Sequence, residues 1–353
     1  MMPRKESAIT ADPAPPTPHL SVRPEWLALH HEDIIDPAMP IVDPHHHLWD
    51  RQGNRYFLLD LLHDIATGHN IRATVAVEAG AMYRHDAVAE LRPVGETEFL
   101  NGTAAMSASG EYGESRVCAG IVGHADLLLG ERVRPVFDAQ IRAGGDRFRG
   151  VRFTSAWHPD PAARASLANP PPHVLRNPDF RSGFAQLAPL GLSFDAWMYH
   201  TQIPELVDLA RAFPETVIIV NHVGGAIGIG PYAGKRDAVF AEWGASIREL
   251  ARCPNVHVKL GGLGMRLFGF DFASRAHPPS SEDLAQCWRP YIEACIEAFG
   301  AERCMFESNF PVDKASCSYA VLWNAFKRIA AAASPGERQW LFSGTASKVY
   351  RLS

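Results

Sequence analysis

The residues best suited to chemistry form the run DPHHH at residues 43–47, directly after a short apolar stretch. Side chains alternate across a strand, so His45 and His47 project to one side and His46 to the other. Two imidazoles with this spacing at a strand end can hold one metal ion or clamp one substrate. The run predicts an active site organised around His45 and His47, and the alternative is a cluster of surface-loop histidines.

Polar side chains also end other apolar runs. His222 follows the run 217–221 and precedes two glycines, and Arg152 lies within FRGVRF at 148–153. A guanidinium in this position can bind a carboxylate or a lactone oxygen through two hydrogen bonds, or form an ordinary ion pair. We expect the residues at these strand ends to contact the substrate, namely Arg152, Glu78, His124, Asp195, Trp197 and Lys259.

The elements that position these residues alternate along the chain. Short β-branched runs are separated by helical stretches, from 86–91 to 319–332, which is the pattern of a parallel sheet closed on itself. We predict a single-domain (β/α)₈ barrel, in which long loops over 80–116, 154–176 and 261–281 lie at the C-terminal face. The expected strands are Ile41–Asp43, Ala73–Val77, Val117–Val122, Phe148–Phe153, Leu192–Trp197, Thr216–Asn221, Val256–Leu260 and Cys304–Phe306.

Composition narrows the class of protein. The 353 residues are 46% hydrophobic and 21% charged, enough apolar material for a large core. A net charge of −5 gives no basic footprint for nucleic acid, and no apolar run is long enough to span a membrane. The Pro-rich residues 1–22 lack the apolar core of a secretory signal, so we expect a disordered or loosely attached arm before a domain at 23–353, and a cytoplasmic protein.

Six segments of the chain carry a family resemblance. They are VDPHHHLWD at 42–50, FRGVRF at 148–153, IIVNHVGG at 218–225, VKLGGLGM at 258–265, MFESNFPVDK at 305–314 and SGTASKVYRL at 343–352. Together they resemble the amidohydrolase superfamily, specifically amidohydrolase family 2 with its sugar-lactone and pyrone-dicarboxylate lactonases. The resemblance implies a (β/α)₈ barrel that hydrolyses lactones or amides with an activated water. It matches His45, His47 and His222 to the family's histidines and Arg152 to its arginine. Some relatives use a divalent metal, often zinc, others need none, and a few are decarboxylases.

The chain departs from the family in its last strand. Family members usually read Gly-Ser-Asp-Trp-Pro there, whereas this chain has Glu307-Ser308-Asn309-Phe310-Pro311. The amide of Asn309 cannot take a proton from water as the family's aspartate does. Glu307 shares a face with Asn309, so we hypothesise that Glu307 takes over the base or metal-ligand role. In the alternative, Glu307 is a structural partner of Lys259 or Arg152.

These observations predict a hydrolase that opens a lactone or a related cyclic ester. The predicted catalytic residues are His45, His47, His222, Glu307 and Asn309, and all of these except Asn309 form the predicted metal-ligand set. The predicted cofactor is one divalent metal, zinc before others, with a metal-independent enzyme as the alternative. We expect a small, anionic, ring-containing substrate and leave a homo-oligomer open. A decarboxylase of the same fold and a catalytically silent binding protein are the competing functions.

Overall fold

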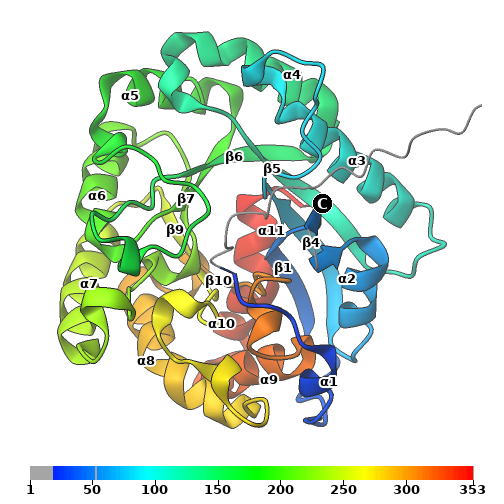
Figure 1. Ribbon diagram of the computed structural model, residues 1–353. Helices are drawn as coiled ribbons and strands as arrows, with labels where there is room; N and C mark the ends of the chain where they lie inside the picture. Colours follow the sequence, from blue (N-terminus) through cyan, green and yellow to red (C-terminus); the bar gives the residue numbers. More distant parts are fainter. Residues whose placement is uncertain (1–18, 52–53, 353) are drawn as a thin grey trace, which may run out of the picture.

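The computed structural model describes residues 19–51 and 54–352. Its centre is an eight-stranded parallel sheet whose strands follow one another in chain order (Figure 1). A parallel bridge between His46 and Phe310 joins the first strand to the segment after the last, so the sheet closes and the predicted (β/α)₈ barrel is confirmed. The strands are β1 (Pro40–His46), β4 (Asn70–Val77), β5 (Arg116–His124), β6 (Phe148–Thr154), β7 (Ser193–Trp197), β8 (Ile218–Val220), β9 (Val256–Leu260) and β10 (Cys304–Phe306).

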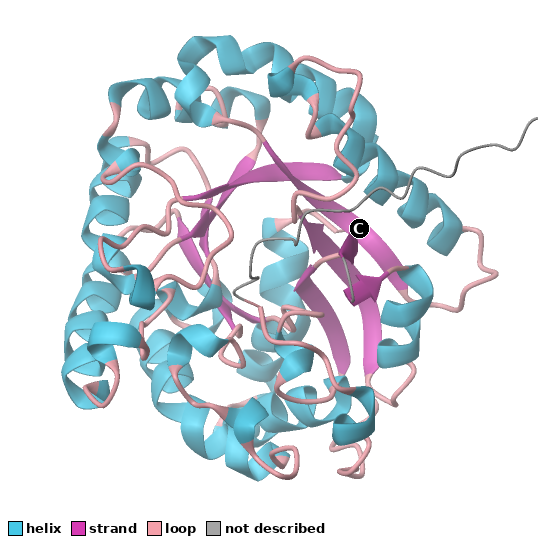
Figure 2. Cartoon of the chain, in the orientation of Figure 1, coloured by secondary structure: helices cyan, strands magenta, loops and turns pink. Residues whose placement is uncertain are grey.

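Helices surround the strands, as Figure 2 shows. Their ends carry the expected signals: Ser280 caps α8 in a reciprocal capping box with Asp283, and Ser318 caps α9 through its side chain. The larger helices are α2 (Leu58–Ile65), α3 (Val94–Ala108), α4 (Arg134–Gly144), α5 (Pro178–Phe184), α6 (Ile203–Ala212), α7 (Arg236–Leu250), α8 (Ser281–Phe299) and α9 (Tyr319–Ile329); α1 (Pro24–Leu27), α10 (Pro335–Gln339) and α11 (Thr345–Val349) are short.

The barrel interior is divided between an apolar end and a polar end. At the apolar end, residues of β1, β4, β5, β8 and β10 pack against the end of the chain, where α11 and Tyr350 belong to the same cluster. This cluster comprises Val42, Ala73, Val75, Val77, Val122, Ile219, Met305, Ala346, Val349 and Tyr350. Small and β-branched side chains fill a narrow barrel well, and the polar residues are left to the C-terminal ends of the strands.

Several elements were not predicted, among them α1, α2 and features of the segments that follow β1 and β4. The segment 80–116, expected to be mainly a long loop, contains the 15-residue helix α3, and residues 49–56 form a small antiparallel pair of β2 (Trp49–Arg51) and β3 (Asn54–Tyr56). The α3 sequence carries glycines that obscure helical periodicity. Gly95 is required there, because a Cβ atom would lie 2.4 Å from the carbonyl oxygen of Met82. Tertiary packing therefore outweighs the weak local propensity of this helix.

The N-terminal segment falls partly within the described residues. Of the arm predicted over 1–22, residues 1–18 lie outside them, and residues 19–22 lead without regular structure into α1. Trp26 and Leu27 of α1 are buried, and the indole Nε1 of Trp26 donates to the carbonyl oxygen of Arg275 at 3.0 Å. Among the described helices, none combines the length and apolar character needed to cross a membrane.

Candidate active site

A cavity of about 540 Å³ opens at the C-terminal ends of the strands. Seven of the residues predicted from the sequence line it, and they come from strands on all sides of the barrel. They are His47, Glu78, His124, Arg152, Trp197, His222 and Asn309. Their convergence on one cavity locates the site at the end of the barrel where enzymes of this architecture place their catalytic groups.

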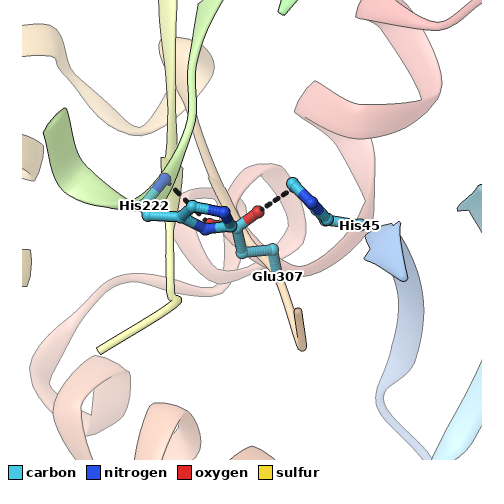
Figure 3. Close-up of side chains that lie close together, drawn as sticks. All are labelled: His45, His222 and Glu307. Atoms are coloured by element: carbon cyan, nitrogen blue, oxygen red, sulfur yellow. Dashed lines mark hydrogen bonds and ion pairs between the residues drawn. The ribbon is translucent and has the colours of Figure 1, made fainter. Parts of the chain in front are cut away.

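Beneath the cavity, Glu307 lies between two histidines (Figure 3). One carboxylate oxygen is 2.7 Å from Nδ1 of His45, and the other is 2.7 Å from Nδ1 of His222 and also accepts the backbone N–H of His222 at 3.0 Å. The side chains of Glu307 and His45 are fully buried. A carboxylate on each Nδ1 directs the Nε2 atom of each ring away from Glu307, which orients both imidazoles.

His47 is oriented in the same manner by a different acceptor. Its Nδ1 lies 2.8 Å from the carbonyl oxygen of Val77, and its Nε2 lies 3.2 Å from Nε2 of His45. Burial holds the pKa of both His45 and His47 well below the usual value, and the cations of Lys259 and Arg152 respectively add to this effect. Both imidazoles are therefore neutral near pH 7. His46 points to the other face, where it meets Thr74 at 2.8 Å, as strand alternation requires.

Arg152 and Glu78 form a buried ion pair in the cavity wall. The guanidinium Nε donates to the Glu78 carboxylate at 2.7 Å, another guanidinium nitrogen donates to the Glu78 carbonyl oxygen, and NH1 lies 3.4 Å from Nε2 of His45. Burial alone would raise the pKa of Glu78, but Arg152 holds it below the usual value. The guanidinium is thus fixed in direction beside the imidazoles.

Asp195 and Lys259, which we expected to contact the substrate, do not reach the cavity. Both side chains are fully buried below it, with Nζ of Lys259 2.7 Å from the Asp195 carboxylate and 3.3 Å from Nδ1 of His45. Asp195 also accepts hydrogen bonds from Asn221 at 2.9 Å and from the Tyr350 hydroxyl at 3.0 Å. Asp195 precedes Trp197 by one pleat repeat on β7. The ion pair of Asp195 with Lys259 therefore lies deeper in the barrel than the cavity and supports the site from below.

Asn309, which the sequence resemblance pairs with the family's aspartate, lies in the cavity wall. It has a left-handed backbone (φ 54°), and its Nδ2 donates to Oδ1 of Asp313 at 2.9 Å. Among the described residues, its Oδ1 has no hydrogen-bond partner. Asp313 also accepts the backbone N–H of Gly264 at 2.9 Å, and burial raises its pKa to about 8. The amide is held in the cavity wall as a fixed polar group.

Sequence reasoning missed a second arginine in the cavity wall. Arg51 of β2 stacks its guanidinium 3.9 Å from the ring centre of Trp49, and it donates to the carbonyl oxygen of Ala79. The β2–β3 pairing turns Arg51 toward the cavity. The motif VDPHHHLWD ends at residue 50, just before Arg51, and so did not include it. Only a prediction of the hairpin at 49–56 could have indicated that Arg51 faces the cavity.

One ligand atom from each of His45, His222 and Glu307 lies within 4.8 Å of the others, a spacing that could hold a metal ion. The Nε2 atoms of His45 and His47 form a second arrangement. Two nitrogens bound to one tetrahedral zinc at about 2.0–2.1 Å lie about 3.3 Å apart, close to the 3.2 Å found here. Neutral imidazoles with fixed Nδ1 partners fit a divalent metal.

Comparisons with known proteins agree with this geometry. Residues 42–352 match the model of the amidohydrolase family, and the chain belongs to that family. The uncharacterized protein y4mH of Sinorhizobium fredii is 36% identical over 326 residues, covering 88% of this chain and 98% of that protein. The L-fucono-1,5-lactonase of Burkholderia multivorans is 27% identical over 328 residues, covering 88% of this chain and 96% of the lactonase.

A solved structure of an amidohydrolase from Burkholderia multivorans with bound zinc is also similar. It aligns with a TM-score of 0.66 at 25% identity, covering 89% of this chain and 100% of that chain. The resemblance inferred from the six sequence segments is therefore confirmed at the level of the family and the barrel.

Proposed function

We propose that this protein hydrolyses a lactone or a related cyclic ester. The observation that carries the proposal is the group of three imidazoles, His47 and His222 at the cavity floor and His45 just beneath it, each with its Nδ1 next to an acceptor and beside the fixed guanidinium of Arg152. Such a group can activate water and stabilise the oxyanion that forms when water attacks a carbonyl. The similarity to a lactonase over 88% of the chain supports the same reaction class.

In the proposed reaction, His222 is the general base. Glu307 holds Nδ1 of His222, so Nε2 takes a proton from the attacking water as the water oxygen bonds to the carbonyl carbon. Arg152 faces the carbonyl oxygen, whose negative charge rises at this step. The ring C–O bond then breaks, and the His222 imidazolium returns the proton to the leaving alkoxide. The product is an open-chain hydroxy acid. Glu307 acts through the imidazoles and replaces the family's aspartate only indirectly.

A divalent metal fits the same floor. His45 and His47 would hold it through Nε2, with Glu307 as the outer partner of His45, and when bound it would polarise a carbonyl oxygen as a Lewis acid. Metal content measured on purified variants separates the two ligand arrangements. If the Nε2 pair of His45 and His47 is the metal site, His47→Ala should lose the metal, and Glu307→Gln should bind it more weakly. Metal loss in Glu307→Gln alone would favour the set with Glu307 as a direct ligand.

We propose a ring-containing, anionic substrate. The rings of Tyr83 and Trp197 line the cavity and can pack on a flat ligand, while Arg51 and Arg152 supply positive charge to its wall. Arginine suits this task, because its planar donors recognise carboxylates and oxygen-rich groups in a fixed orientation.

The test is a substrate screen with two readouts. Sugar-acid lactones and 2-pyrone-4,6-dicarboxylate are assayed for acid release, and aromatic acids for carbon dioxide. We expect acid release from a lactone, with kcat at least about 100-fold lower in His222→Gln. The control is His63→Gln, at an exposed position on α2, and its kcat should be unchanged. Carbon dioxide release without lactone opening would replace the proposal with a decarboxylase. Ligand binding without turnover would leave a silent binding protein.

A further inference from the structure

A second, smaller cavity shares a loop with the candidate active site. Residues 165–171 of the loop after β6 line the large cavity, whereas residues 157–159 and His173 of the same loop line the small one. The opposite wall of the small cavity is the segment that leads into α6, with Thr201 and Glu205. Its volume is about 220 Å³, and among the described residues the two cavities have no lining residue in common. The small cavity is therefore a separate place for a ligand, which the proposed reaction does not use.

Two buried oxygen atoms of residues that line this cavity lack hydrogen-bond partners. Among the described residues, neither Oε2 of Glu205 nor Oγ1 of Thr201 has one. Glu205 is only 6% exposed, and its other carboxylate oxygen lies 2.6 Å from Nδ1 of His173. Buried polar atoms in folded proteins are nearly always paired. The two unpaired acceptors indicate that the cavity takes a molecule that carries hydrogen-bond donors.

The charge of the cavity favours a cation. Glu205 is the one acidic side chain among the described lining residues, and none of these residues is a lysine or an arginine. Its carboxylate lies in the first turn of α6 and takes the place that an anion would otherwise occupy at the helix N-terminus. The ring of Trp157 also lines the cavity, and aromatic faces attract cations. His158 does not supply a free donor, because its Nδ1 meets the backbone of Asp160 and its Nε2 meets the Tyr232 hydroxyl at 3.2 Å.

We propose that this cavity binds a small primary ammonium compound, whose N–H groups donate to Glu205 and Thr201 while its carbon chain packs on Trp157 and Pro159. A primary ammonium group carries three donors, which suits the unpaired oxygens, whereas a quaternary ammonium group carries none. The inference does not depend on the proposed lactone reaction. It adds a second ligand site, whose occupant would contact the loop that also walls the active-site cavity.

The test measures the binding of n-butylammonium chloride by ligand-observed NMR, without lactone and at constant ionic strength. The comparison ligands are 1-butanol, which keeps the carbon chain without the charge, and tetramethylammonium chloride, which keeps the charge without the N–H donors. We expect saturable binding of n-butylammonium, with a Kd at least about 10-fold lower than for either comparison ligand, because hydrogen bonds between charged groups are the stronger ones. No saturable binding, as for a cavity that holds water only, or equal Kd values for the three ligands would overturn the inference.

Substitutions that keep side-chain shape locate the site. Glu205→Gln should raise the Kd for n-butylammonium about 10-fold by removing the charge, and Thr201→Val should raise it about 3-fold by removing one acceptor. The matched control is Glu215→Gln, at an exposed position shortly after α6, and its Kd should equal that of the wild type. Urea denaturation shows whether each variant is folded, and Thr201→Val decides if Glu205→Gln is not. A folded Glu205→Gln or Thr201→Val protein with the wild-type Kd would overturn the inference. Because no lactone is present, either result leaves the proposed function to its own test.

Discussion

Two polar layers lie at the same end of the barrel but differ in what they can touch. The upper layer, defined here as His47, Arg152, His222 and Asn309, lines the cavity. The lower layer, defined as His45, Asp195, Lys259 and Glu307, is fully buried and held together by its own ion pairs and hydrogen bonds. The difference shows that polar residues at neighbouring strand ends can have separate tasks, with the lower layer orienting the upper one.

The largest expected effect concerns the stability of the lower layer. Lys259→Met should lower the free energy of unfolding by about 3–5 kcal/mol, because it leaves the buried Asp195 carboxylate without its cation. Urea denaturation measures the loss. The control Lys235→Met, at an exposed position, should change it by less than about 0.5 kcal/mol. Adding Asp195→Asn to Lys259→Met should recover part of the loss. A fully stable Lys259→Met protein would show that the lower layer is not structural.

The second prediction tests whether the lower layer orients the upper one. Glu307→Gln should lower kcat about 100-fold with a smaller change in KM, because an amide nitrogen cannot accept the Nδ1–H of one of the two histidines. Steady-state kinetics on the best lactone measure the split. Glu293→Gln, at an exposed ion pair on α8, is the control. Full activity in Glu307→Gln would show that the lower layer does not orient the upper one.

The sequence was sufficient for the architecture of the site because strand periodicity fixes which side chains face inward. Of the residues selected from the sequence, His47, Arg152 and His222 line the cavity, and each directly ends or closely follows an apolar run. The periodicity could not show how deep in the barrel each side chain lies. Asp195 and Trp197 share a face of β7, but a two-residue step along a strand is about 6–7 Å, enough to separate the lower layer from the cavity.

Long-range contacts account for what the sequence could not show. Glu307 meets His45 and His222 across the barrel, so its partners depend on closure of the whole sheet. The hairpin that turns Arg51 toward the cavity is too short to have a periodic signal. His19 reaches the cavity because α1 docks on a loop about 250 residues away in the chain.

The third prediction tests the upper layer alone. Arg152→Lys should lower kcat about 10-fold while leaving the free energy of unfolding within about 1 kcal/mol, because lysine keeps the charge but not the forked donors that bind Glu78 and aim the guanidinium at the developing oxyanion. Arg149→Lys, on the same strand but partly exposed outside the cavity wall, should change neither quantity. A loss of stability comparable to that of Lys259→Met would mean that the two layers do not differ in task.

The last prediction concerns the pH dependence of stability at Asp313, which joins the layers by holding Asn309 from below. Burial raises its folded pKa to about 8, above the usual 3.8, so between these pH values the native state holds a proton that the unfolded chain has lost. The stabilisation is complete below about pH 4 and disappears as pH rises through 8, at up to about 1.4 kcal/mol per pH unit. Asp313→Asn should abolish this slope. Unfolding free energies of both proteins from pH 5 to 9 test it, because the difference between the curves isolates Asp313 from Glu96, whose pKa burial also raises to about 8. Parallel curves would mean that Asp313 is charged in the folded protein, so that the boundary between the two layers is anionic.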